Sequence, residues 1–238
     1  MSDPNPGDPG FREKSQNQLV LSFLWVRFFV GLVGLLVPLL LIAYTVTAGN
    51  WQLAPSISDF FHTGGREIMV GGLSAVAVFL FAYKGFEDDP RWPSDRLVSR
   101  FTAVAALCVA FFPNKLLPGE TCSWLQCIFG GFTKYVHYGA AIAFFAGLAV
   151  FCLVNFRRSA LGTTPSKRKQ ERNVIFLMCG IGLVVSLVAI ILGSVFDFGG
   201  SFVFWAESVG VWIFAVSWLF KGESLGPLAR VAQVLPGR

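Results

Sequence analysis

Several polar side chains that could exchange protons or bind ions lie beside or inside long apolar segments of this chain. Ser58, Asp59 and His62 fall in one short stretch, and Arg66 and Glu67 follow it directly. Ionisable groups in such places are costly unless they face the interior of a helix bundle or a water-filled cavity. These five residues are therefore candidates for a binding or proton-transfer site.

His137 and Glu207 bring ionisable groups from two other apolar segments to the same side. Glu207 comes five residues after Phe202, which on a helix is about 7–8 Å from that end. We expect Glu207 to meet Arg66 or a histidine, because an opposite charge or a shared proton lowers the cost of burial. In the alternative interpretation these groups form a buried ion pair that only fixes helix register.

The histidine content limits the metal chemistry. The chain has only 2 His, so a zinc site with three histidines is impossible. His62, His137 and one carboxylate such as Glu207 would leave an open position for water, as catalytic zinc requires. No HExxH, GxSxG, P-loop or CxxCH motif occurs. The cofactor is therefore unknown, with zinc as one possibility, and the sequence assigns no catalytic residue.

The second apolar segment is short for a membrane span. Its uncharged part, residues 68–83, would extend about 24 Å as a helix, less than a hydrocarbon core of about 30 Å. The helix is therefore expected to start earlier and to draw Arg66 and Glu67 into the outer leaflet, with Ser58 as a suitable N-cap.

On one continuous helix Asp59, His62 and Arg66 would recur at i, i+3 and i+7 and share a face. The paired glycines at 64–65 interrupt this pattern. In the alternative interpretation they separate a short interfacial helix from the membrane span.

Six apolar segments must position these side chains. A spanning helix needs about 20 mostly apolar residues, and lipid forces backbone polar groups to pair within their own segment. Only 14% of the residues are charged, about half the share of a soluble domain. The segments cover residues 19–47, 67–86, 98–117, 135–156, 174–196 and 202–220. We predict an all-α transmembrane bundle of six spans over residues 19–221, with a disordered tail at 1–18 and a short tail at 222–238.

The basic residues predict an orientation. Of the 19 Lys and Arg residues, 16 fall near the N-terminus, in the second and fourth loops or in the C-terminal tail. Only Arg66, Lys115 and Lys134 fall on the other side. The positive-inside rule then places both termini in the cytoplasm of a multi-pass protein, which we expect in a bacterial inner membrane. The net charge of +5 is explained by contact with anionic lipid, not with nucleic acid.

The five cysteines fall into two groups. Cys122 and Cys127 share the third loop on the predicted outer side, where an oxidising environment favours a disulfide. Half of a metal site is the alternative, although that loop offers no further ligands. Cys108, Cys152 and Cys179 lie inside predicted spans and are interpreted as packing residues.

Two segments carry a resemblance to known families. The run GGREIMVGGLSAVAVFLFAYKGF at 64–86 and the run FWAESVGVWIFAVSWLFKG at 204–222 resemble a family of bacterial six-helix membrane proteins without assigned function. There is also a remote similarity to the alkaline ceramidase and progestin/adipoQ receptor (CREST) superfamily.

Members of that superfamily are membrane hydrolases with a Ser, an Asp and three His around zinc. Ser58, Asp59, His62 and His137 match in residue type. The chain departs from the pattern because it has six predicted spans rather than seven and no His-x-x-x-His in its last helix. Both departures count against zinc hydrolysis.

Two classes of function fit these observations. In the first, an outward-facing polar pocket binds or hydrolyses a lipid or amphiphile that enters from the outer leaflet. In the second, the protein is a non-catalytic subunit of a membrane complex or a small transporter, and the polar cluster is structural. A cavity open to the outer side would favour the first, and mutually satisfied charges would favour the second.

Overall fold

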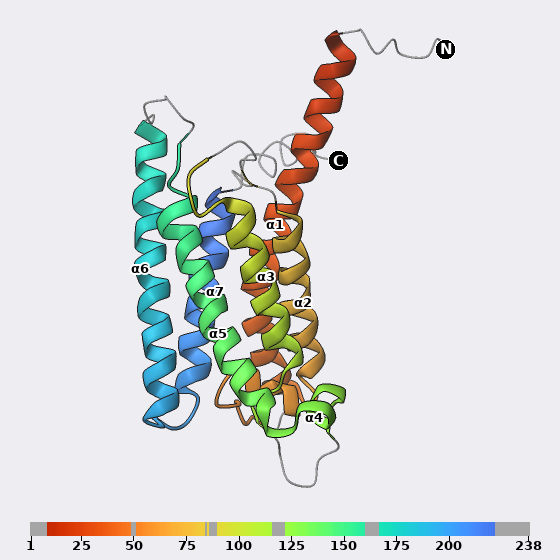
Figure 1. The fold of residues 1–238 in the computed structure, drawn as a ribbon, viewed down its shortest axis with the longest axis vertical. Coiled ribbons are helices and arrows are strands. Elements are labelled where there is room, and N and C mark those ends of the chain that lie inside the picture. The colour runs from red at the N-terminus through yellow and green to blue at the C-terminus, as the bar shows by residue number, and fades with distance from the viewer. Residues whose placement is uncertain are drawn as a thin grey trace, which may run out of the picture.

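The computed structural model describes residues 9–48, 51–83, 85, 90–115, 122–159 and 167–221. All regular structure in this part of the chain is helical (Figure 1). Six long helices pack side by side, each against two neighbours, in the circular order α1, α2, α3, α5, α6 and α7. Their bounds are Pro9–Thr47, Arg66–Ala82, Asp95–Phe111, Thr133–Val150, Lys167–Val195 and Phe202–Lys221 in that order.

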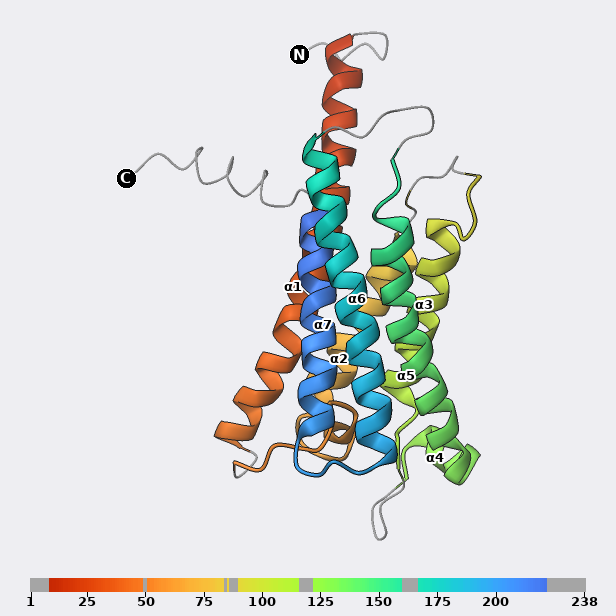
Figure 2. The ribbon, with the colours of Figure 1, turned by 90° about the vertical axis from the view of Figure 1, so that its left-hand side faces the viewer.

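Four short helical elements complete the fold. They are the 3-10 turns η1 (Ser58–His62) and η2 (Gly130–Phe132), the helix α4 (Trp124–Phe129) and the π-helical turn η3 (Phe151–Asn155). The helix α4 and the turn between α6 and α7 lie at the end of the bundle opposite the N-terminal part of α1 (Figures 1 and 2).

In the described part of the chain, four helical stretches are long and apolar enough to cross a membrane: Phe28–Thr47, Trp124–Asn155, Lys169–Val195 and Phe202–Lys221. The outward surface is apolar as well, since Val174, Val185 and Val195 of α6 are 60–70% exposed. The all-helical, membrane-like fold is therefore confirmed. The helices α2 and α3 have 17 residues each, about 26 Å, and are too short to be counted among these four stretches.

Several helix boundaries differ from the predicted segments. The helix α1 begins at Pro9 rather than at residue 19, so part of the tail predicted at 1–18 is helical. Proline suits a first helical turn, because its missing N–H has no partner there anyway. The helix α3 ends at Phe111 because Pro113 disfavours helical geometry at the residue before it. The predicted tail at 222–238 lies outside the described residues.

The loop between α1 and α2 is fixed by an apolar cluster at one end of the bundle. Phe60 of η1 is 1% exposed and packs with Leu41, Met69 and Phe204. The rings of Phe60 and Phe204 lie 5.9 Å apart. The turn η1 is therefore part of the core rather than a surface loop.

The helix α4 was not predicted, although a capping box marks its start. The Ser123 hydroxyl accepts the Gln126 N–H, and the Gln126 side chain accepts the Ser123 N–H. A disulfide joins Cys122 to Cys127, with the Cα atoms 5.4 Å apart, which confirms the predicted pairing.

A buried polar group joins the helices at the end of the bundle opposite η1. Asp95 is 4% exposed and accepts a hydrogen bond of 2.6 Å from the Asn155 side chain. Tyr83 donates to the other carboxylate oxygen, and the Arg158 guanidinium lies 4.0 Å away. This group fastens α2, α3 and the π turn to one another.

Candidate functional site

Three consecutive residues of the loop between α1 and α2 are each held by a different part of the fold. The Ile57 N–H donates to Glu207 of α7 at 2.6 Å. The Ser58 hydroxyl lies 2.8 Å from Nε2 of His137 of α5. Asp59 accepts from the Asn114 side chain, beyond α3. The site is therefore built on one short segment at positions 57–59, which bonds to groups from three sides of the bundle.

The backbone of this loop also bonds to the start of α7. The Phe204 N–H donates to the Pro55 carbonyl at 2.8 Å, and the Ser201 hydroxyl donates to the Leu53 carbonyl at 3.1 Å. Together with the buried Phe60 ring, these bonds leave Ser58 little freedom to move. The loop thus presents Ser58 in one fixed place.

Ser58 and His137 form a buried pair with a defined proton order. They are 6% and 2% exposed. Nδ1 of His137 lies 2.6 Å from the Phe112 carbonyl oxygen, which can only accept, so Nδ1 carries the proton. Nε2 is then the acceptor, and the Ser58 hydroxyl donates to it. A hydroxyl pointed at the basic nitrogen of an oriented histidine is the arrangement of an activated nucleophile.

Ser58 had been predicted as the N-cap of a helix. The structure contradicts this, because η1 has Ile57 at its cap position with no capping side chain, and the Ser58 hydroxyl turns to His137. The glycine break is confirmed, since α2 starts at Arg66 with Gly65 as its cap. Asp59 and Arg66 consequently lie on separate elements and share no continuous helix face.

Asp59 is the charged member of the group. Lys115 approaches its Oδ1 at 2.7 Å, and the Ser56 hydroxyl donates to Oδ2 at 2.9 Å. Burial by itself raises the pKa of Asp59, but the hydrogen bonds from Lys115, Asn114 and Ser56 outweigh it and leave the pKa below its ordinary value of 3.8. Asp59 is therefore a carboxylate at neutral pH and serves as an electrostatic anchor.

Glu207 is buried, as expected, but its partner differs from the predicted one. We expected Arg66 or a histidine, whereas the hydrogen-bond partner is the Ile57 backbone amide. A main-chain donor satisfies the carboxyl group without a second buried side chain. Arg66 and Glu67 are exposed at the start of α2, and the Arg66 guanidinium lies 4.0 Å from the centre of the Phe61 ring. His62 is partly buried, with its ring 5.4 Å from that of Phe61.

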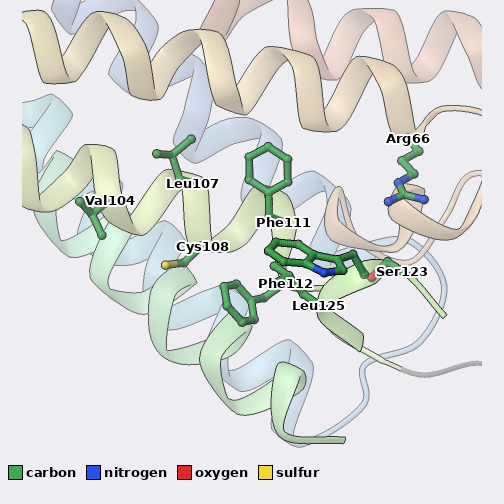
Figure 3. A pocket seen from close by; sticks show the side chains of 9 residues that line it. Arg66, Val104, Leu107, Cys108, Phe111, Phe112, Ser123 and Leu125 are labelled. Atoms are coloured by element: carbon green, nitrogen blue, oxygen red, sulfur yellow. The ribbon is translucent and has the colours of Figure 1, made fainter. Parts of the chain in front are cut away.

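A groove with a volume of about 470 Å³ lies next to this group (Figure 3). Arg66 and Ser123 are at one end and Val104 is at the other, so the groove has a polar end and an apolar end. Its lining residues come from α2, α3 and the segment around α4, and they are Arg66, Val104, Leu107, Cys108, Phe111, Phe112, Ser123, Trp124 and Leu125.

Phe112 connects the groove to the buried pair. Its side chain lines the groove, and its carbonyl accepts the proton of His137 Nδ1. Ser58 and His137 do not line the groove themselves. They therefore lie behind the wall of the groove, and Phe112 separates them from it.

The residues present do not fit zinc. Both ring nitrogens of His137 already have partners, namely the Phe112 carbonyl and Ser58. Among the described residues no three His, Cys, Asp or Glu side chains gather as a metal ion would need. The predicted set of His62, His137 and Glu207 is thus not brought together as a ligand set.

Sequence reasoning missed Ser56, Asn114 and Lys115, the partners of Asp59, and it missed the groove. The only local signal was Pro113, which ends α3 and lets Asn114 and Lys115 turn back over the end of the bundle. No family model matches the chain, and no curated protein or solved structure is significantly similar to it.

Proposed function

We propose that this chain is a six-span membrane protein that binds an anionic lipid or amphiphile in the groove at its outer end. The observation that carries the proposal is the groove itself, with mostly apolar walls and the cation Arg66 at its polar end. Its volume of about 470 Å³ is within the usual range of small-molecule sites, about 300–1,000 Å³. The apolar walls suit a hydrocarbon chain, and Arg66 suits an anionic headgroup.

Three observations support the proposed topology, with both termini in the cytoplasm. The basic residues are strongly asymmetric between the two sides of the chain. The helices α2 and α3 each pack between two other long helices, which agrees with their serving as short second and third spans. The disulfide of Cys122 lies on the proposed outer side, where an oxidising environment maintains it. A bacterial inner membrane is the proposed location.

Lipid competition tests the binding function. The purified, delipidated protein would be mixed with micelles that hold equal amounts of phosphatidylglycerol and phosphatidylcholine, and bound lipid would be counted by native mass spectrometry. We expect preferential retention of the anionic lipid. Arg66→Gln should abolish that preference, whereas Leu107→Trp should block binding of both lipids by filling the groove.

Lys134→Gln is the matched control, because Lys134 is a cation near the same end and does not line the groove. It should leave the preference unchanged. Equal lipid retention by the wild type, Arg66→Gln and Leu107→Trp would refute the proposal.

One observation favours a second candidate function, that of an accessory subunit of a membrane complex or a small transporter. Glu207 and Asp59 each have hydrogen-bond partners inside the bundle. A satisfied polar cluster can serve only to hold the loop in place. In that case no lipid would be retained at the groove, and the lipid-facing helices would instead bind another membrane subunit.

A further inference from the structure

We propose that Ser58 is a nucleophile, activated by His137, that cleaves an acyl ester of the amphiphile held in the groove. This inference rests on the proposed function and adds an activity to it. It begins from the contact between the Ser58 hydroxyl and Nε2 of His137, 2.8 Å apart.

The pair and the Phe112 carbonyl together supply the three groups that an activated serine requires. Ser58 is the nucleophile, His137 is the base, and the Phe112 carbonyl orients the base by accepting its Nδ1 proton at 2.6 Å. The orienting group fixes the tautomer in which Nε2 can accept a proton.

The surrounding loop holds Ser58 in that geometry. The Ile57 N–H is fixed by Glu207, and the Asp59 carboxylate is fixed by Lys115, so the residues on both sides of Ser58 are anchored. A nucleophile held on fixed neighbours loses little freedom when it reacts. The anchors thus act as positioning residues, and Ser58 and His137 are the groups that react.

Phe112 controls access to the pair. Its ring is half-buried and lines the groove, while its carbonyl bonds to His137 on the other side. An ester in the groove reaches Ser58 when the Phe112 ring turns aside. This ring keeps water away from the pair while the groove holds no substrate.

The reaction balances with an ester and water as the two reactants. Ser58 Oγ forms a bond to the ester carbonyl carbon, and its proton passes to Nε2 of His137. The bond from that carbon to the alcohol oxygen breaks, and the alcohol leaves with the proton from His137. Water then attacks the acyl-serine with His137 as base, which releases the carboxylic acid and restores the Ser58 hydroxyl.

An active-site probe tests the assignment. The full-length protein in lipid nanodiscs would be treated with an alkyl fluorophosphonate, and the modified peptide would be identified by mass spectrometry. We expect modification at Ser58, none in Ser58→Ala, and a rate about a hundredfold lower in His137→Gln. Phe112→Ala should raise the rate by opening the wall of the groove.

Ser194→Ala is the control, since Ser194 is an exposed serine on α6. The Ser194→Ala variant should be modified at Ser58 at the wild-type rate. Lipid retention, measured on the same samples, separates the two proposals: Ser58→Ala should still bind lipid. Retained lipid without modification of Ser58 in the wild type and in Phe112→Ala would overturn the nucleophile, whereas loss of lipid retention in the wild type would overturn the binding function.

Discussion

Oε2 of Glu207 lies 2.6 Å from the backbone nitrogen of Ile57, across 150 residues of sequence. This bond joins the first turns of α7 to the loop that carries Ser58. A buried N–H that loses its acceptor retains its full desolvation cost, so the bond matters more for what its loss would expose than for its own strength.

Substitutions at Glu207 should therefore separate the effect of the hydrogen-bond acceptor from the effect of the charge. Glu207→Gln keeps an oxygen acceptor for the Ile57 N–H and should change the free energy of unfolding by less than about 1 kcal/mol. Glu207→Leu leaves that N–H without an acceptor and should cost about 1–3 kcal/mol. Denaturation of the detergent-solubilised protein measures both, with exposed Glu67→Gln as the control. A loss in the Gln variant as large as that in the Leu variant would show that the charge itself is required.

Acid should destabilise the loop between α1 and α2 by protonating Asp59. Its folded pKa is lower than the ordinary value of 3.8, because hydrogen bonds outweigh the opposite effect of burial. Its stabilising contribution is therefore complete above about pH 3.8 and is lost as the pH falls through the lower, folded pKa. Asp59→Asn should remove this part of the acid dependence, whereas Asp197→Asn in an exposed turn should keep it. The midpoint of thermal unfolding at pH 6 and at pH 3 gives the comparison. An equal fall of this midpoint in the wild type and in Asp59→Asn would contradict the expectation.

The disulfide should be visible in a count of thiols. Alkylation of the denatured, unreduced protein should modify the three free cysteines, Cys108, Cys152 and Cys179, and reduction should raise the number to 5. Because the closed loop is short, we expect the double substitution of Cys122 and Cys127 by serine to cost only about 2 kcal/mol. Five reactive thiols before reduction, in protein purified without reductant, would exclude the bond.

Two glycine substitutions should have opposite effects. Gly85 has φ of 65°, and a Cβ atom there would clash with Cβ of Asp95, so Gly85→Ala should cost more than about 2 kcal/mol. Gly139 lies in α5 with nothing within 4 Å of an added Cβ, so Gly139→Ala should be neutral or slightly stabilising. Unfolding midpoints of the two variants check this pair, and equal midpoints would argue against the close approach of Gly85 to Asp95.

The proposed topology predicts the behaviour of reporter fusions. A phosphatase that is active only outside the cytoplasm should be inactive when fused after Arg238 and active when inserted beside Cys122. A green fluorescent protein fused after Arg238 should fluoresce. Phosphatase activity at Arg238 would require either an odd number of spans or both termini outside, and either result would overturn the proposed topology.

The sequence alone determined the six long helices, and it predicts the side that each loop occupies. Lipid cannot hydrogen-bond to backbone groups, so a long apolar run must be helical, and such runs are read locally from composition. The pairing of Cys122 with Cys127 was accessible for the same reason, because both residues lie in one short loop. Of the candidate site, the segment containing Ser58 and Asp59 and the distant groups His137 and Glu207 were identified by their ionisable side chains in apolar surroundings.

The tertiary structure decided which of these groups meet. Ser58 and His137 are 79 residues apart, and their contact depends on how α5 is rotated and how η1 is buried by Phe60, which no local pattern specifies. Charge complementarity led to Arg66 as the partner of Glu207, but the backbone N–H of Ile57 occupies that place. Every residue except proline carries such a backbone donor, so sequence gives no sign of which one will be left to bond with a buried carboxyl group. Only the packing of the loop against α7 makes that choice.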